Sequence, residues 1–303
     1  MGGGGTAGTA AGGAAGNTAG GGAAGGPAGP MVDRANPELH HVTFGADDAD
    51  SGARRALGDQ HAFLDTRVAS RGRLVVYLHG AGTFQSCGGG ALGPLIAGLG
   101  LHWFAPCYVS DYGVDNCGAN IEGCRLEAFE GADRHAFVSI ARPDSIEERL
   151  VRGLRYLQQR NPGGDWQYFL DGDSPRWSAI VISGHSHGAS SSAVIGMHRS
   201  VARVVMLAGP YDPDQAWLTR QPITPRDRFF GFTHSGDSQH SGHLAALEQL
   251  GVPGTPTSVD NATPPYGQSQ RLTSSRSGGD AHGSVTSGDI AAYVPVWEYL
   301  FGG

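Results

Sequence analysis

One pentapeptide combines residue types that could carry out nucleophilic chemistry: Gly184-His185-Ser186-His187-Gly188. In a chain with 50 glycines, a bare Gly-x-Ser-x-Gly is expected about 0.6 times by chance, so the flanking sequence has to decide. Residues 179–182 read as a buried strand and residues 189–197 as a helix of small residues, the setting in which a sharp turn exposes a serine oxygen. The free N–H groups at the start of that helix favour negative charge. We therefore predict that Ser186 is a nucleophile rather than part of a simple strand-to-helix link.

A serine hydroxyl attacks at neutral pH only if a histidine takes its proton and a carboxylate orients that histidine. His282 is the first choice for this base because it lies in a polar loop, residues 278–283, just before the predicted closing helix. The other histidines downstream of the pentapeptide are His198, His234, His240 and His243.

The acid should follow one of the later strands. Asp237 comes shortly after the predicted strand at residues 229–233 and is the first choice. Asp212, one strand earlier in Gly209-Pro210-Tyr211-Asp212, is the second choice. Asp260 and Asp280 are interpreted as solvated loop charges.

The tetrahedral intermediate of acyl transfer needs two converging N–H donors. His187, directly after the serine, supplies one candidate. The turn His79-Gly80-Ala81-Gly82, which follows the apolar run at residues 73–78, supplies the other. Ala81 is the preferred donor, with Gly82 or Thr83 as alternatives, and an ordinary glycine-rich turn remains the competing interpretation.

Together these motifs resemble the α/β-hydrolase superfamily, within its esterase and lipase branch, over roughly residues 70–300. The family order of nucleophile, acid and histidine implies a triad of Ser186, Asp237 and His282. The resemblance also implies a mainly parallel, eight-stranded sheet with helices on both faces. Two departures are that the turn after the early strand lacks a full His-Gly-Gly-Gly signature and that residues 211–228 leave no room for a large lid domain.

The chain divides into a Gly/Ala-rich tether at residues 1–30 and one predicted α/β-hydrolase domain at residues 31–303, because the tether lacks the apolar side chains needed to offset ordering entropy. The net charge is −7 and the basic residues are all arginine, scattered along the sequence. This argues against nucleic-acid binding. No run of 18 apolar residues and no signal-peptide pattern is present, so we expect membrane contact only through an N-terminal anchor that has been removed.

All four cysteines lie in one short segment, at Cys87, Cys107, Cys117 and Cys124. Two disulfides would suit a secreted or cell-surface protein, and we predict the pairs Cys87–Cys107 and Cys117–Cys124. Four buried thiols remain an alternative, whereas a zinc site lacks the usual close spacing.

The predicted order of elements places strands and helices in alternation, which indicates a parallel sheet covered on both faces. Strands are expected at residues 39–44, 61–68, 73–78, 101–109, 178–183, 201–207, 229–233 and 257–259. Helices are expected at residues 91–99, 143–160, 187–198, 244–250 and 289–300, and residues 110–142 are expected to be irregular.

We therefore predict a carboxylic-ester hydrolase that works through an acyl-enzyme on a small-molecule, lipid or polymeric ester. No cofactor and no metal are expected, because the histidines that flank the serine cannot easily face one ion. An acyltransferase or peptidase on the same scaffold is the alternative, and a non-catalytic binding protein that has kept the fold is the rival from another class.

Overall fold

The computed structural model describes residues 1–4, 29–55, 57–82, 87–212, 214–276, 279–288 and 290–302. Most of the predicted tether, residues 5–28, lies outside these ranges, as does Thr83, one of the alternative oxyanion donors. The first described segment after this gap joins the folded part of the chain, where the Asp33 N–H donates a hydrogen bond to the Gly163 carbonyl at 2.7 Å.

In the described ranges nine strands form one sheet, in the order β1-β2-β4-β3-β7-β8-β9-β11-β10. Their bounds are β1 (Leu39–Phe44), β2 (Gln60–Asp65), β3 (Leu74–Leu78), β4 (His102–Ala105), β7 (Ile180–His185), β8 (Arg203–Leu207), β9 (Phe229–His234), β10 (Thr257–Ser258) and β11 (Arg271–Ser274). The seven strands from β4 to β10 are parallel, and β2 pairs antiparallel with both β1 and β4. The carboxyl ends of β3, β7, β8 and β9 therefore meet at one edge of the sheet, where ligands bind in folds of this kind.

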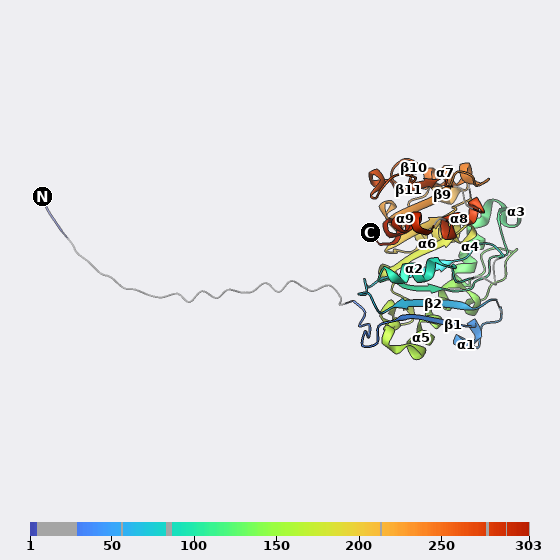
Figure 1. Cartoon of the computed structure of the whole chain (residues 1–303), viewed down its shortest axis with the longest axis horizontal. Coiled ribbons are helices and arrows are strands. Elements are labelled where there is room, and N and C mark those ends of the chain that lie inside the picture. The colour runs from blue at the N-terminus through green and yellow to red at the C-terminus, as the bar shows by residue number, and fades with distance from the viewer. Residues whose placement is uncertain are drawn as a thin grey trace.

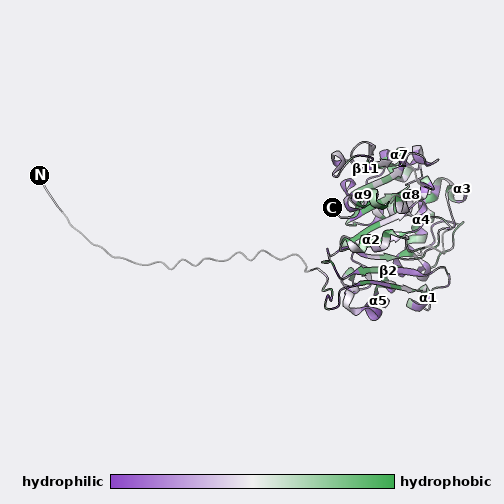
Figure 2. Cartoon of the chain, in the orientation of Figure 1, coloured by the Kyte–Doolittle hydropathy of each residue, from purple (hydrophilic) through white to green (hydrophobic). Residues whose placement is uncertain are grey.

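Helices cover both faces of the sheet (Figure 1). The side chains of β3 alternate between the two faces of the sheet. Leu74, Val76 and Leu78 belong to one hydrophobic core, and Val75 and Tyr77 belong to the other. Helices α4 (Ile121–Glu130), α5 (Ile146–Arg160), α6 (His187–His198) and α7 (His240–Gln249) cover the first face, and α2 (Leu92–Gly98), α8 (Ala281–Ser287) and α9 (Ile290–Gly302) the second. Figure 2 shows hydrophobic residues along the central strands and hydrophilic ones toward the periphery.

Helix α5 follows the amphipathic pattern of its sequence. Its N-cap is Ser145, whose Oγ accepts a hydrogen bond from the Glu148 N–H at 3.2 Å, and it ends at Arg160 before Asn161-Pro162. Leu150, Leu154 and Leu157 are buried on one stripe, as the spacing predicts.

Two features differ from the sequence predictions. The sheet has nine strands rather than eight, since the polar segment Arg271–Ser274 pairs with β9 as β11. Residues 110–142, predicted to be irregular, contain α3 (Val114–Cys117) and α4. Helix α4 is buried on nearly all sides, including Arg125 and Glu127, so its sequence has no amphipathic stripe to reveal it.

Two disulfides join the predicted pairs, Cys87–Cys107 and Cys117–Cys124. The first links the segment after β3 to the end of β4, and the second links α3 to α4. Among the described helices, none is both long and apolar enough to cross a bilayer.

Candidate active site

Ser186 occupies a sharp turn between β7 and α6, with φ 56° and ψ −117°. A positive φ is costly for a residue with a side chain and is typical of functional turns. The two glycines of the pentapeptide are required by close packing: a Cβ on Gly188 would lie 2.0 Å from the Leu78 carbonyl oxygen, and one on Gly184 would lie 2.3 Å from the Gly188 backbone. The local sequence therefore holds the serine in this strained conformation.

The turn after β3 lies against the serine. A Cβ on Gly80 would be 3.6 Å from the Ser186 Cβ. The His79 ring stabilises this turn, because its Nε2 accepts a hydrogen bond from the Tyr108 N–H at 3.2 Å and its Nδ1 donates to the Gly80 carbonyl at 2.8 Å. Ala81 is exposed at the tip.

The two predicted oxyanion donors line the same cavity as Ser186. Within the described ranges no acceptor is recorded for the backbone N–H of Ala81 or of His187. The side chain of His187 is buried, and its Nδ1 donates to the Tyr108 hydroxyl at 2.9 Å, which in turn donates to the His79 carbonyl at 3.0 Å. The ring thus anchors this part of the chain and leaves its backbone amide available.

Asp237 and His282 are hydrogen-bonded, with 2.6 Å between Asp237 Oδ2 and His282 Nδ1. The carboxylate is almost fully buried, whereas the His282 side chain is 28% exposed. Burial tends to raise the pKa of Asp237, but hydrogen bonds from the Gln239 N–H at 2.9 Å and from His282 outweigh it, so this pKa lies below its ordinary value. The acid is therefore ionised at neutral pH and holds a proton on His282 Nδ1.

His282 is delivered by the first turn of α8 rather than by the predicted loop. The Asp280 side chain caps this helix by accepting hydrogen bonds from the N–H groups of His282 and Gly283. His185, next to the serine, donates from Nε2 to the His282 carbonyl at 2.9 Å, and the two rings lie 4.8 Å apart. The structure thus places His282 beside the turn that carries Ser186, whose hydroxyl forms no hydrogen bond within the described residues.

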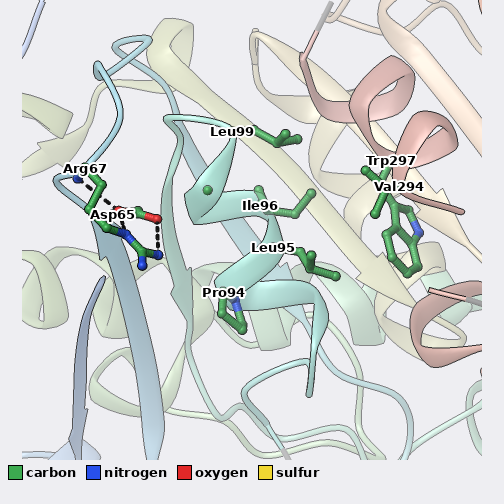
Figure 3. Close-up of a pocket in the computed structure, with 9 residues that line it drawn as sticks. Asp65, Arg67, Pro94, Leu95, Ile96, Leu99, Val294 and Trp297 are labelled. Carbon is green, nitrogen blue, oxygen red and sulfur yellow. Dashed lines mark hydrogen bonds and ion pairs between the residues drawn. The ribbon is translucent and has the colours of Figure 1, made fainter. Parts of the chain in front are cut away.

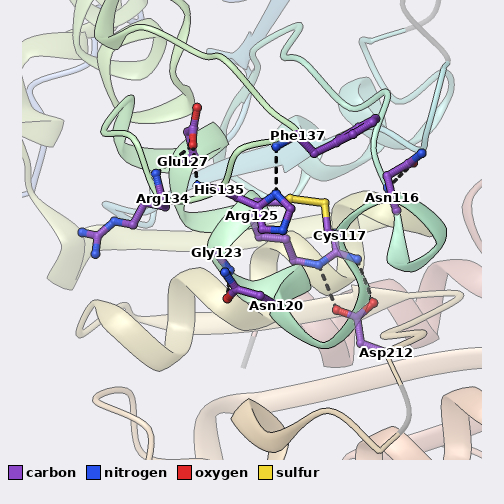
Figure 4. The surroundings of a disulfide bond; sticks show 12 residues. Asn116, Cys117, Asn120, Gly123, Arg125, Glu127, Arg134, His135, Phe137 and Asp212 are labelled. Atoms are coloured by element: carbon purple, nitrogen blue, oxygen red, sulfur yellow. Dashed lines mark hydrogen bonds and ion pairs between the residues drawn. A yellow bond between two sulfur atoms is a disulfide. The ribbon is translucent and has the colours of Figure 1, made fainter.

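Asp212, the second-choice acid, has a different partner (Figure 4). Its two oxygens accept hydrogen bonds from Arg125 Nε and Nη2 at 2.9 and 2.8 Å, and both side chains are at most 4% exposed. Arg125 also donates from Nη1 to the His187 carbonyl at 3.2 Å and to the Ser191 hydroxyl at 3.1 Å. This pair joins α4 to the start of α6.

Two of the histidines set aside in the sequence lie near Asp237. His234 accepts a hydrogen bond from the Gly236 N–H on Nδ1 and donates from Nε2 to the Arg276 carbonyl, which fixes the turn leading to Asp237. His243 is fully buried, with its Nδ1 3.8 Å from Asp237 Oδ2. The sequence signal for His234 is its place between a buried strand and the acid; His243 had no such signal.

A cavity of about 370 Å³ opens beside Ser186 and is lined by Ala81, Tyr112, Arg125, His187 and Tyr211 among others. Residues 112–115, just before the Cys117–Cys124 disulfide, form one wall. A second cavity of about 340 Å³ lies between α2 and α9 (Figure 3). Its charged residues, Asp65 and Arg67, are paired with each other, so it offers no free nucleophile or base.

This architecture is the α/β-hydrolase fold. A solved S-formylglutathione hydrolase from Agrobacterium tumefaciens is similar, with a TM-score of 0.51, 14% identity, and coverage of 88% of this chain and 95% of that one. A Staphylococcus aureus S-formylglutathione hydrolase matches at a TM-score of 0.48, with 11% identity and coverage of 87% and 97%. A feruloyl esterase module from Clostridium thermocellum matches at a TM-score of 0.45, with 14% identity and coverage of 88% of each chain. No model of a protein family and no curated protein sequence matches this chain.

Proposed function

We propose that this protein is a serine hydrolase that cleaves carboxylic esters through an acyl-enzyme. The observation that carries the proposal is the contact between two units: the strained turn that holds Ser186, and the hydrogen-bonded pair of Asp237 and His282, joined through His185. This contact supports a nucleophile, a base and an orienting acid gathered at one edge of the sheet.

In the proposed reaction, Ser186 Oγ attacks the ester carbonyl while His282 Nε2 takes the hydroxyl proton. Asp237 keeps the other ring nitrogen protonated and stabilises the imidazolium that forms. The backbone N–H groups of Ala81 and His187 hold the oxyanion. His282 then gives its proton to the leaving alkoxide, and water, activated by the same ring, releases the acid. Nucleophile–base hydrogen bonds are often long in the free enzyme and tighten when substrate binds.

The cavity beside Ser186 supports an ester with an apolar part as substrate. Its walls include Tyr112 and Tyr211. The described residues between 211 and 228 contain only short 3₁₀ turns, Ala216–Thr219 and Arg226–Arg228. With no lid domain in this described segment, bulky, lipid or polymeric esters could enter.

Fluorophosphonate labelling tests the proposal. The wild-type protein should be labelled and should hydrolyse nitrophenyl esters, and Ser186→Ala should abolish both. Ser192→Ala is the matched control, since this buried serine on α6 has no hydrogen-bond partner in the described residues. An unlabelled, inactive wild-type protein would favour a non-catalytic binding role.

Labelling alone does not separate ester hydrolysis from peptide hydrolysis or acyl transfer. A panel of nitrophenyl esters of increasing chain length, run beside the corresponding anilides and with an added alcohol acceptor, makes that distinction. Faster turnover of esters to free acid supports the proposal.

We further propose an exported or cell-surface location. The two disulfides support it, because such bonds persist mainly in oxidising compartments. A thiol count on denatured, unreduced protein isolated from its native location tests it, and four free thiols would contradict it.

A further inference from the structure

A second histidine lies beside the proposed acid. His243, on α7, is 0% exposed, and neither of its ring nitrogens has a hydrogen-bond partner among the described residues. Buried polar atoms are nearly always satisfied, so this ring requires an explanation. Its neighbours are Tyr211, whose ring it meets edge-on at 5.7 Å, and His282, whose ring centre is 6.1 Å away.

Asp237, His243 and His282 each direct a metal-binding atom toward the others. One such atom from each residue lies within 4.8 Å of the other two. Asp237 Oδ2 is 2.6 Å from His282 Nδ1 and 3.8 Å from His243 Nδ1. Ligands at about 2.0 Å from a tetrahedral zinc ion are roughly 3.3 Å apart, so small side-chain rotations would bring these three atoms to that spacing.

We infer that Asp237, His243 and His282 form an inhibitory binding site for a zinc ion. Two imidazoles and one carboxylate suit zinc, and the fourth position of the tetrahedron is left for water. The inhibition rests on the proposed hydrolase function, whereas the metal site itself does not.

The protonation of these groups favours binding. Both ring nitrogens of His243 lack a hydrogen-bond partner among the described residues, so the neutral ring has a lone pair to give. Asp237 is ionised. The zinc ion would replace the proton that Asp237 and His282 share at Nδ1, and this proton would leave to solvent. A metal-bound His282 is a poorer base at Nε2 and cannot take the Ser186 proton.

Metal binding is tested on the Ser186→Ala variant, so that the result does not depend on catalysis. We expect zinc chloride to bind with one-to-one stoichiometry in isothermal titration calorimetry and cobalt chloride to give the visible absorption of a tetrahedral site. Adding His243→Phe should weaken zinc binding at least 10- to 100-fold. His243→Gln serves as a second variant if the phenylalanine disturbs folding. No binding to Ser186→Ala, or equal binding with and without His243, would overturn the inference.

Inhibition is tested on the otherwise wild-type enzyme with a nitrophenyl ester. Zinc should inhibit reversibly, with release by a chelator, and magnesium should not inhibit because it prefers oxygen ligands. His243→Phe should raise the half-inhibitory zinc concentration at least tenfold relative to its own uninhibited rate. His240→Gln and His41→Gln are matched controls. His240 lies on the same helix as His243, but its Nδ1 is hydrogen-bonded to the Thr233 hydroxyl on β9, and His41 pairs with His61 at the surface. A control that shifts inhibition as much as His243→Phe would overturn the site. Zinc binding without any esterase activity would support the site and refute the proposed function.

Discussion

The loop after β8 and the loop after β9 lie at the same edge of the sheet, and each carries a buried aspartate. The two aspartates have opposite surroundings. Asp212, after β8, is held by a buried arginine with two parallel hydrogen bonds. Asp237, after β9, is held by a backbone N–H and by a histidine that is 28% exposed. The charge of Asp212 is neutralised by Arg125, and no histidine of the described residues is hydrogen-bonded to it. The Asp237 carboxylate, in contrast, can stabilise a positive charge that forms on His282.

Burial alone therefore does not identify a catalytic acid. Both carboxylates are nearly inaccessible, yet only one partner, His282, can change its charge during a reaction at neutral pH. Arginine stays protonated throughout. The Asp212 loop is therefore interpreted as a structural clamp and the Asp237 loop as part of the proposed triad.

The largest expected effect is a loss of activity that distinguishes the proposed catalytic acid, Asp237, from the structural clamp at Asp212. Asp237→Asn should lower kcat for a nitrophenyl ester about 10³- to 10⁴-fold, because the amide no longer holds the reactive tautomer of His282. Asp212→Asn, measured on the folded protein, should lower kcat far less. Steady-state kinetics at neutral pH check this, and a larger loss in Asp212→Asn would reverse the assignment.

The free energy of unfolding should fall more in Asp212→Asn than in Asp237→Asn, the opposite of the order expected for activity. Asp212→Asn leaves the Arg125 guanidinium buried without its counter-charge, so the free energy of unfolding should fall by about 3–5 kcal/mol. The double variant Arg125→Met/Asp212→Leu should recover most of this loss. Urea unfolding followed by circular dichroism measures both, with Asp237→Asn as the comparison. A loss below about 1 kcal/mol for Asp212→Asn would refute the clamp.

The surroundings of Asp237 should also respond to acid. Burial lowers the pKa of His243 to about 4, below the value of about 6.5 in an unfolded chain. As the pH falls below 6.5 the unfolded state takes up this proton before the folded state does, so stability is complete above pH 6.5 and is lost down to about pH 4. Relative to His243→Phe, the wild-type protein should lose roughly 3 kcal/mol more over this window.

Urea midpoints at several pH values between 7 and 4 measure this difference. Because the comparison is between two variants, the contribution of titratable groups that lie far from His243 cancels. Identical pH profiles would mean that His243 is protonated as easily in the folded protein as in the unfolded one.

The smallest expected effect comes from the disulfide that precedes Arg125 in the sequence. The Cys117–Cys124 disulfide closes a short loop just before Arg125. Cys117→Ser/Cys124→Ser should lower the free energy of unfolding by about 2–3 kcal/mol. KM should rise, since residues 112–115 line the cavity beside Ser186, while kcat should change less than threefold because the Asp237 loop does not depend on this bond. A tenfold fall in kcat with KM unchanged would show that the two loops are coupled.

The local features of the site could be predicted from the sequence. A buried strand, a tight glycine-containing turn and a small-residue helix are short-range signals, and they located Ser186, the His79–Gly82 turn and most strands of the parallel sheet. The cysteine pairs could be predicted as well, since few pairings were possible. Helix α4 and strand β11 could not, because one lacks an amphipathic stripe and the other lacks apolar alternation.

What only the tertiary structure decided is which side chains meet. Sequence order ranked Asp237 above Asp212, but the Arg125 partner of Asp212 lies 87 residues away on a helix that was not predicted. The position of His243 beside Asp237 likewise depends on how α7 packs against β9. Local conformation follows from steric and hydrogen-bonding preferences of neighbouring residues, whereas the partner of a buried charge depends on which distant segments the folded core brings within about 3 Å of it.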